Sequence, residues 1–224
     1  MKTTKRQQTW AKLDQDKVYA LADAIEALRE FASKKFDESL EIAIRLGIDV
    51  TKADQNIRGM LSLPNGTGKT VRVAVFTVNS ADEAKKAGAD VVGGEELIEK
   101  VAGGEINFDR VIATPDMMPK MSKVARILGP KGLMPNPKLG TVTNNVADAV
   151  KVAKAGQIEY RAEKKGIIHA GIGKMSFKTD ALVENAMALI EQLKKVKPSS
   201  SKGQYILGVS VATTQGPGLK VDVK

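Results

Sequence analysis

The sequence predicts a mixed fold that combines α+β and α/β architecture in two parts. In the outer segments, residues 1–67 and 157–224, strand-like runs of alternating apolar and polar residues are interspersed with stretches of helical spacing. In residues 68–156, short apolar strands alternate with short helices, the pattern of a parallel sheet. Neither outer segment has enough elements to close its own core. We therefore predict a split α+β first domain formed by both termini and an α/β second domain inserted into it.

The first outer segment is expected to begin with a loose basic arm over residues 1–12. Apolar residues at helical spacing then predict an amphipathic helix from Lys17 to Ala32, with Asp14 or Asp16 as its cap. Strict alternation over residues 40–48 predicts a strand with one buried face. A polar loop and a shorter strand at 59–63 complete this segment.

In the middle segment, residues 71–78 are almost continuously apolar and β-branched, as expected of a strand that is covered on both faces. Further strands are predicted at 90–92 and 110–114. Helices are predicted over 80–89, 95–101 and 144–155. The basic stretch 117–147 is expected to form a short helix followed by a rigid loop, because its prolines disfavour regular structure.

The last segment predicts two strands, 157–161 and 166–172, joined by the charged turn 162–165. A helix capped by Thr179 and a final strand over 205–212 follow, and residues 213–218 are expected to turn sharply. The two crossings between domains are rich in glycine, at Gly66, Gly68 and Gly156. Two parallel linkers of this kind predict a hinge.

Composition narrows the class of protein. The 224 residues have a net charge of +9 and an isoelectric point of about 9.6, which favours nucleic acid or another anionic surface as a partner. Cysteine is absent, so disulfides, thiolate metal sites and cysteine nucleophiles are excluded. The chain has neither a membrane-spanning apolar run nor a secretory signal, and a cytoplasmic location is the simplest expectation.

The basic stretch 117–147 contains five cations and no acid: Lys120, Lys123, Arg126, Lys131 and Lys138. Charges of both signs are normally interspersed on a globular surface, so this stretch indicates a surface for a polyanion. The alternative is an irregular loop whose lysines are merely solvated.

No catalytic constellation stands out. Gly68-Lys69-Thr70 resembles the end of a phosphate-binding loop, but Leu63 replaces the required first glycine and a strand follows where a helix is needed. Asp116 follows a strand without a partner acid, base or metal ligand, so a turn or cap is expected there. His169 is the only histidine, and it is either an ordinary sheet residue or an RNA contact. No metal or other cofactor is implied.

RNA binding has independent support. Aromatic residues make up only 4% of the chain and are scattered, which is unlike proteins that stack successive bases on a sheet. A folded RNA read through its backbone and 2′-hydroxyls requires lysines, hydroxyl side chains and close backbone approach. The motifs Lys34-Lys35-Phe36 and Thr213-Thr214-Gln215-Gly216 meet these requirements, although each is weak alone.

Several dispersed motifs resemble those of one family. They include residues 128–142 (LGPKGLMPNPKLGTV), Lys35-Phe36-Asp37-Glu38, Gly47-Ile48-Asp49, 54–59 (DQNIRG), 87–90 (AGAD), 92–96 (VGGEE), Thr114-Pro115-Asp116 and Thr213-Thr214. This set is similar to bacterial members of the L-one family of the large ribosomal subunit, the protein of the mobile side stalk, and the similarity runs nearly end to end.

The resemblance implies a split α+β first domain and an inserted Rossmann-like second domain. It implies that the first domain binds large-subunit rRNA at the stalk base, that the protein assists movement and release of exit-site tRNA, and that it represses its own messenger RNA through a leader element. The protein would act as a monomer within the ribosome. The implied RNA-binding residues are Lys35, Phe36, Ser39, Lys164, Lys165, His169, Lys174, Thr213, Thr214, Gln215 and Gly216.

One position departs from the family. Gln215 stands where the family usually has methionine, so a polar side chain replaces an apolar contact. Two other classes remain open on the residues alone. A small basic α/β enzyme would reveal itself by turnover of a nucleotide, and a DNA-binding factor by a preference for duplex DNA over folded RNA.

Overall fold

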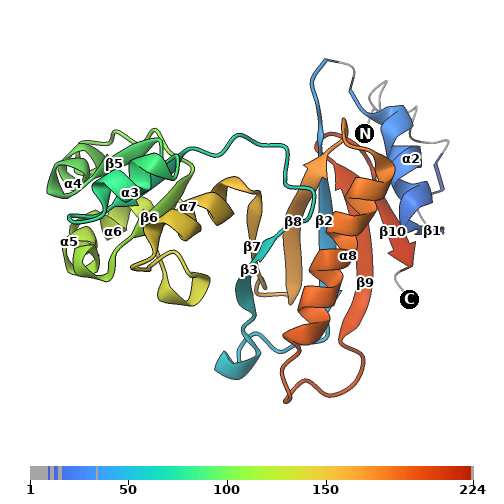
Figure 1. Ribbon diagram of the computed structural model, residues 1–224. Coiled ribbons are helices and arrows are strands. Elements are labelled where there is room, and N and C mark those ends of the chain that lie inside the picture. The colour runs from blue at the N-terminus through green and yellow to red at the C-terminus, as the bar shows by residue number, and fades with distance from the viewer. Residues whose placement is uncertain (1–9, 11–12, 15–16, 34, 223–224) are drawn as a thin grey trace. The chain divides into compact units, whose positions relative to one another are not determined.

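The computed structural model describes the chain except for residues 1–9, 11–12, 15–16, 34 and 223–224. Its architecture is a mixture of helices and sheets (Figure 1). The chain divides into two compact units. The terminal unit comprises Met1–Gly68 and Ile158–Lys224, and the inserted unit comprises Lys69–Gln157.

A five-stranded sheet with the order β1-β10-β9-β2-β8 is the centre of the terminal unit. β1 and β10 are parallel, and the other neighbouring strands are antiparallel. The strands are β1 (Val18–Ala20), β2 (Ser39–Leu46), β8 (Ile167–Lys174), β9 (Ile206–Thr213) and β10 (Gly218–Asp222). In β2, Leu40, Ile42 and Ile44 are buried while Glu41 and Arg45 are exposed. The predicted half-buried strand is confirmed.

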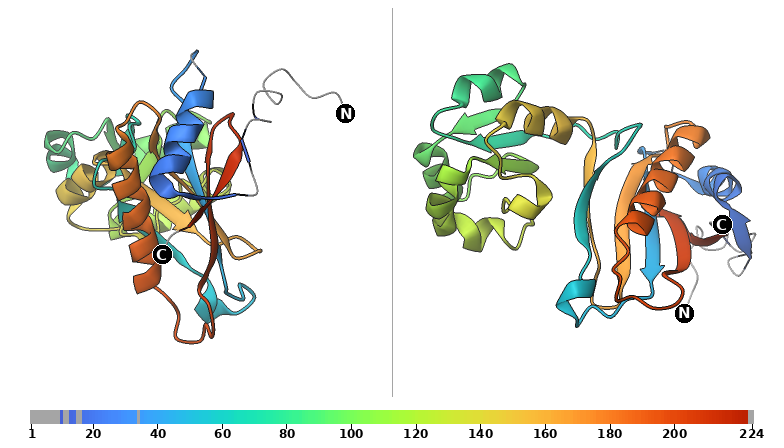
Figure 2. Two further views of the ribbon diagram at one scale, coloured as in Figure 1. Left: turned by 90° about the vertical axis from the view of Figure 1, so that its right-hand side faces the viewer. Right: turned by 60° about the horizontal axis from the view of Figure 1, so that its bottom comes forward.

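Two helices, α2 (Leu21–Phe31) and α8 (Thr179–Lys195), contact the sheet and each other. Figure 2 shows α8 running alongside β8. Ile25 and Leu28 of α2 and Leu189 and Ile190 of α8 are fully buried in the same core as the apolar side chains of β2. Burial of each such side chain contributes about 1.5–3 kcal/mol. The two helices therefore cover one face of the sheet and leave the other face free of them.

The predicted start of the first helix is wrong. Val18–Ala20, expected in its first turn, instead form β1, because they pair with β10 from the other end of the chain. The helix α2 has Ala20 at its cap position and no side-chain cap, and the Asp14 carboxylate instead accepts the Lys17 N–H at 3.2 Å. Long-range strand pairing here overrides a local helical pattern. The expected basic arm (apart from Trp10) and Asp16 lie outside the described residues.

The C-terminal end also differs from expectation. The turn after β9 is followed by β10, a strand that the sequence pattern did not predict. Leu219 and Val221 alternate with exposed residues, but two apolar positions are too few to indicate a strand by themselves. Likewise, Thr179 is the first residue of α8 rather than its cap, and Lys178 occupies the cap position.

A two-stranded sheet completes the terminal unit. It pairs β3 (Arg58–Ser62) with β7 (Gln157–Arg161), and the short turn of 3₁₀ helix η1 (Ala53–Gln55) precedes it. Arg58 and Glu159 form an ion pair across the two strands at 2.8 Å. Ile158 and Tyr160 extend into the core of the main sheet.

The inserted unit is built on a three-stranded parallel sheet with the order β5-β4-β6. All four residues of the central strand β4 are buried. Ala74 and Phe76 belong to one hydrophobic cluster and Val73 and Val75 to another, so the strand is covered on both faces, as predicted. The strands are β4 (Val73–Phe76), β5 (Val91–Gly93) and β6 (Arg110–Ala113).

Helices pack on both faces of this sheet. α3 (Ala81–Lys86) and α7 (Val146–Lys154) share one cluster, and α4 (Glu95–Ala102) contributes to the other. The basic stretch and the residues just before it contain more helix than predicted. Four short pieces follow one another directly from Pro115 to Leu128, and a segment rich in glycine and proline separates them from a fifth. These pieces are η2 (Pro115–Met117), α5 (Met118–Met121), η3 (Ser122–Val124), α6 (Ala125–Leu128) and η4 (Pro137–Leu139).

Pro137 explains one of these pieces. It stands at the first position of η4, where the missing proline N–H is no loss, and the Asn136 side chain accepts the Lys138 N–H. Proline therefore starts a helical turn here rather than excluding one. Among the described residues, no helix has the length and apolar content needed to cross a membrane.

Candidate nucleic-acid interface

The face of the main sheet opposite α2 and α8 is lined by small and polar residues. In the register of the sheet, Ala43 of β2 lies between His169 of β8 and Ser210 of β9. Two residues earlier in β2 and on the same face, Glu41 lies between Gly171 and Ala212. His169 is exposed in this face. Small side chains leave a flat backbone surface that a large partner can approach closely.

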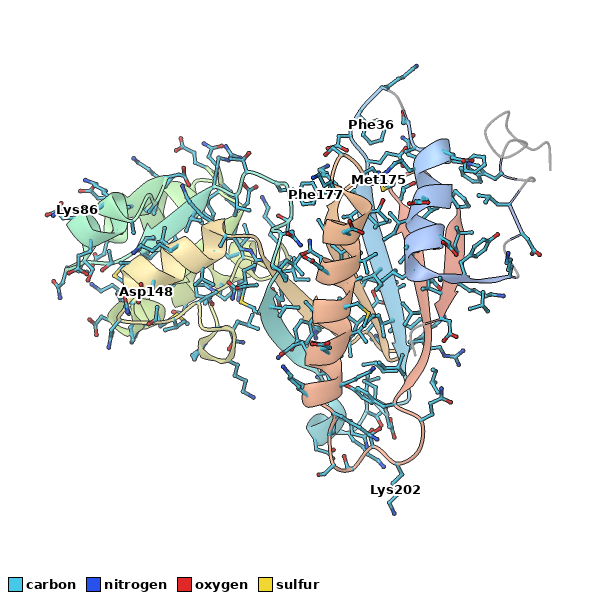
Figure 3. All side chains as sticks on the ribbon, turned by 45° about the vertical axis from the view of Figure 1, so that its right-hand side comes forward. Phe36, Lys86, Asp148, Met175, Phe177 and Lys202 are labelled. Carbon is cyan, nitrogen blue, oxygen red and sulfur yellow. The ribbon has the colours of Figure 1, made fainter. Side chains whose placement is uncertain are left out.

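The loop before β2 presents the predicted lysine and aromatic residue to solvent. Lys35 is exposed, and the Phe36 side chain is 43% exposed although it is large and apolar. Figure 3 shows Phe36 at the same end of the terminal unit as Met175 and Phe177. An exposed aromatic ring beside a lysine suits stacking on a base or ribose.

This loop is fixed from the turn after β8. The Asp37 carboxylate accepts hydrogen bonds from the Ser176 N–H at 3.1 Å and the Ser176 hydroxyl at 2.7 Å. The ammonium of Lys174, another predicted RNA-binding residue, donates to the Asp37 carbonyl at 3.1 Å. Lys174 is half-buried, and its ammonium group holds the loop that contains Lys35 and Phe36.

The turn after β9 joins the same loop through two hydrogen bonds between Thr214 and Ser39. The Ser39 N–H donates to the Thr214 hydroxyl oxygen at 3.0 Å, and the Thr214 N–H donates to the Ser39 carbonyl at 3.1 Å. These bonds prolong the pairing of β2 with β9 beyond its last regular pair. Two predicted motifs that are far apart in the sequence thus form one continuous surface.

Within this turn, Gly216 has an internal reason to be glycine. A Cβ at Gly216 would lie 2.1 Å from the Thr213 hydroxyl oxygen. That hydroxyl is buried and has no hydrogen-bond partner among the described residues. Gln215, at the position where the family usually has methionine, is exposed at the tip of the turn. Close packing inside the turn therefore requires glycine at position 216, independently of any contact with RNA.

The remaining predicted RNA-binding residues line a groove on the terminal unit. It has a volume of about 890 Å³ and contains both lysines of the charged turn, Lys164 and Lys165, together with His169. The rest of its lining is Val50, Asn56, Glu159, Arg161, Ala162 and Glu163. Glu159 pairs with Arg58, and Glu163 lies 3.9 Å from the His169 Nε2 atom. Lys164 and Lys165 form no ion pair within the described part of the chain, so their charges face solvent.

The register of β2 with β8 relates the two groups of residues. Ser39 pairs with Lys174 at the loop end, and Ala43 pairs with His169 towards the groove. Four residues of strand separate these pairs, or about 13 Å. The predicted RNA-binding residues therefore lie along one strip of the terminal unit, from the loops at the start of β2 to the groove.

Two acidic residues of this region were missed by sequence reasoning. Asp37 and Glu38 adjoin Lys35-Phe36 and belong to the same family-like motif, but neither was among the predicted RNA-binding residues. Glu38 is 1% exposed. Only the fold reveals that both are turned towards the protein, where they bind backbone groups of neighbouring loops.

The glycines of the crossings adopt left-handed conformations, with φ of 67° at Gly66, 69° at Gly68 and 94° at Gly156. The first crossing is fastened at its beginning. Asn185 of α8 is fully buried, donates to the Gly66 carbonyl at 3.0 Å and accepts the Asn65 N–H at 3.0 Å. Gly68 packs against Lys174 and Phe177, where a Cβ would lie about 3 Å from both side chains.

Most cations of the basic stretch 117–147 are exposed on the inserted unit. Lys120 donates a hydrogen bond to Glu95 at the start of α4, and this bond lowers the pKa of the Glu95 carboxyl group. The other four cations, Lys123, Arg126, Lys131 and Lys138, are exposed. Gly68-Lys69-Thr70 leads into β4 rather than a helix, so it lacks the geometry of a phosphate-binding loop. The described residues contain no cluster of three or more side chains able to bind a metal ion.

An exposed sheet face of small and polar residues, with lysines in the loop and groove at its two ends and an exposed aromatic ring, defines a protein suited to binding nucleic acid. Comparison with protein families is more specific. Residues 28–217 match the model of the Ribosomal protein L1p/L10e family, and the chain belongs to this family. It is thus a large-subunit ribosomal protein that binds rRNA, in a family whose members are structural rather than enzymatic.

Proposed function

We propose that the terminal unit is the RNA-binding domain and binds large-subunit rRNA at the mobile stalk. The observation on which this rests is the pair of bonds between Ser39 and Thr214, which unites the Lys35-Phe36 loop and the Thr213–Gly216 turn into one surface. From this surface the strip continues to Lys164, Lys165 and His169 in the groove. Cations here neutralise phosphates, while Phe36 and the exposed Thr214 contact bases and riboses.

The inserted unit is proposed to be a Rossmann-like domain that moves with the stalk. It assists the movement and release of exit-site tRNA, and its exposed cations at Lys123, Arg126, Lys131 and Lys138 suit contact with an RNA backbone. The hinge consists of Gly68 and Gly156, with Gly66 as its anchored end, because Asn185 holds the Gly66 carbonyl. The protein acts as a monomer within the ribosome, in the cytoplasm.

The same RNA surface is proposed to repress translation of the protein's own messenger RNA through a leader element that imitates the rRNA site. Gln215 is expected to influence the ratio of the affinities for rRNA and for the messenger RNA leader. It presents an amide where the family usually has methionine, so an apolar contact is replaced by a hydrogen-bonding one. Gln215→Met is expected to alter the ratio of the two RNA affinities more than the stability of the fold, because the side chain is exposed.

A binding experiment with charge-matched variants tests the RNA-binding surface. The affinity of the full chain for a folded stalk fragment of rRNA is measured over a range of salt concentrations, with unrelated folded RNA as competitor. The double variant Lys164→Gln/Lys165→Gln should bind more weakly and reduce the slope of log affinity against log salt by about 1–2. The control Lys85→Gln/Lys86→Gln removes two exposed charges from α3 of the inserted unit.

The control should retain the wild-type slope for the isolated rRNA fragment. Equal losses in both double variants would mean that only net charge matters and would contradict the proposed surface. A wild-type chain that binds the stalk fragment no better than competitor RNA would contradict the proposed function itself.

A further inference from the structure

A buried carboxyl group lies directly beneath the proposed RNA surface. Glu38 is 1% exposed, although it immediately precedes Ser39, the first residue of β2. Burying a carboxylate without partners is strongly unfavourable, so its contacts report what it does in the fold. Those contacts lead into two loops that are far apart in the sequence.

One oxygen of Glu38 accepts the Ser33 N–H at 2.9 Å, at the beginning of the loop that presents Lys35 and Phe36. The other oxygen accepts the Gln215 N–H at 3.4 Å, at the tip of the turn after β9. The Glu38 carbonyl accepts the Met175 N–H at 2.9 Å, beside the turn that binds Asp37. A single residue therefore bonds to the backbone of every loop at this end of the sheet that contains predicted RNA-binding residues.

We infer that Glu38 is a positioning residue for RNA recognition: its buried carboxyl group sets the relative placement of the Lys35-Phe36 loop and the Thr214-Gln215 turn without touching RNA. This inference rests on the proposed function. It concerns the backbone, because both bonds are to main-chain N–H groups. Side chains on the two loops can then contact adjacent parts of one RNA without the loss of conformational entropy that loose loops would suffer on binding.

Whether removal of the Glu38 carboxylate strengthens or weakens RNA binding distinguishes a positioning role from a purely electrostatic one. Removing a carboxylate makes the surface more positive, and Coulomb interactions alone would then strengthen binding to a polyanion. Loss of positioning has the opposite effect, because the loops must be ordered during binding. Hydrogen bonds to charged groups are among the stronger ones in proteins, so Glu38→Ala is expected to weaken RNA binding by about ten- to a hundredfold.

The test compares Glu38→Ala, Glu38→Gln and a matched control in the full chain. Ser201→Ala is the control, since Ser201 is also buried and donates through its hydroxyl to the backbone carbonyl of Gly47 at 3.0 Å. Gly47 follows the far end of β2, so this bond lies at the opposite end of the strand from Glu38. Figure 3 shows the neighbouring Lys202 at the end of the unit away from Phe36.

Two quantities are measured for each folded variant: the affinity for the rRNA stalk fragment, and amide hydrogen exchange at Ser33 and Gln215 without RNA. Glu38→Ala should lose affinity and exchange faster at both amides. Glu38→Gln keeps the side-chain volume and one acceptor oxygen, so its affinity should be intermediate; it also serves as the test variant if Glu38→Ala fails to fold. Ser201→Ala should bind RNA like the wild type.

Wild-type or tighter binding by a folded Glu38 variant, while the wild-type chain binds the fragment specifically, would overturn the positioning role and leave the proposed function intact. So would unchanged exchange at Ser33 and Gln215. Absence of specific binding by the wild-type chain would overturn the proposed function, and the positioning role would fall with it.

Discussion

Replacement of Asn185 by alanine tests how α8 holds the first crossing. The Asn185 amide donates to the Ile172 carbonyl at 2.8 Å and to the Gly66 carbonyl at 3.0 Å, and its oxygen accepts the Asn65 N–H. Alanine leaves all three backbone groups without this partner. The bond to Ile172 is buried, so its loss costs about 1–3 kcal/mol, while water can partly replace the two bonds near the surface. We expect Asn185→Ala to lower the free energy of unfolding by about 3 kcal/mol.

Urea unfolding of the full chain, followed by circular dichroism, measures this loss. Asn65→Ala is the matched control. It removes two exposed side-chain bonds, to the Ala181 carbonyl and the Glu184 carboxylate, but keeps the Asn65 backbone N–H that Asn185 binds. Its cost should stay below about 1 kcal/mol.

Hydrogen exchange locates the effect. Amides of β8 and of residues 65–66 should exchange faster in Asn185→Ala, while those of β4 and β6 keep their protection, because the inserted unit has hydrophobic clusters of its own. A loss below about 0.5 kcal/mol, or equal losses in the two variants, would refute the interpretation that the hydrogen bonds of Asn185 hold the crossing against β8.

Three further predictions concern the surface, the turn and the inserted unit. Phe36→Ala should weaken binding to the rRNA fragment without lowering stability, because the ring is 43% exposed, whereas Val196→Ala, at a 39% exposed site after α8, should change neither. Gly216→Ala should weaken RNA binding, and adding Thr213→Ala should restore part of it by removing the hydroxyl oxygen 2.1 Å from the new Cβ; no recovery in the double variant would contradict the packing described for the turn. The Val73 N–H and then Lys154 lower the pKa of the Asp90 carboxyl group below 3.8, so its contribution to stability is present above that pH and is lost as pH falls through the folded-state pKa. Asp90→Asn should therefore destabilise the inserted unit at neutral pH in urea unfolding, and the difference from wild type should shrink in acid; a difference independent of pH would contradict this assignment.

Local sequence patterns predicted most elements, because burial imposes a period on the chain. Alternation from Leu40 to Leu46 and continuous apolar sequence at Val73–Phe76 indicated the two kinds of strand that the structure contains. The predictions failed where a distant partner decides the local structure. Val18–Ala20 follow a helical pattern but pair with β10, and β10 itself has too few apolar residues to be recognised alone.

The candidate site was predictable in its exposed residues and not in its supporting ones. Lysine, threonine and glycine motifs indicated Lys35, Thr214 and Gly216, but nothing in the sequence shows that Ser39 and Thr214 are hydrogen-bonded to each other. The role of Glu38 depends on which loops meet around it, and that follows only from the strand order.

The terminal unit is proposed to be the part of the chain that recognises RNA. The most direct test of this proposal compares the full chain with a chain in which a short glycine-rich bridge replaces residues 69–157, using the rRNA stalk fragment, a salt series and competitor RNA. Circular dichroism and hydrogen exchange first establish that the shortened chain is folded. The account predicts that the folded, shortened chain retains specific binding and most of the wild-type salt dependence. Loss of specific binding in a folded, shortened chain would contradict it, and would assign RNA recognition to the basic stretch 117–147 of the inserted unit.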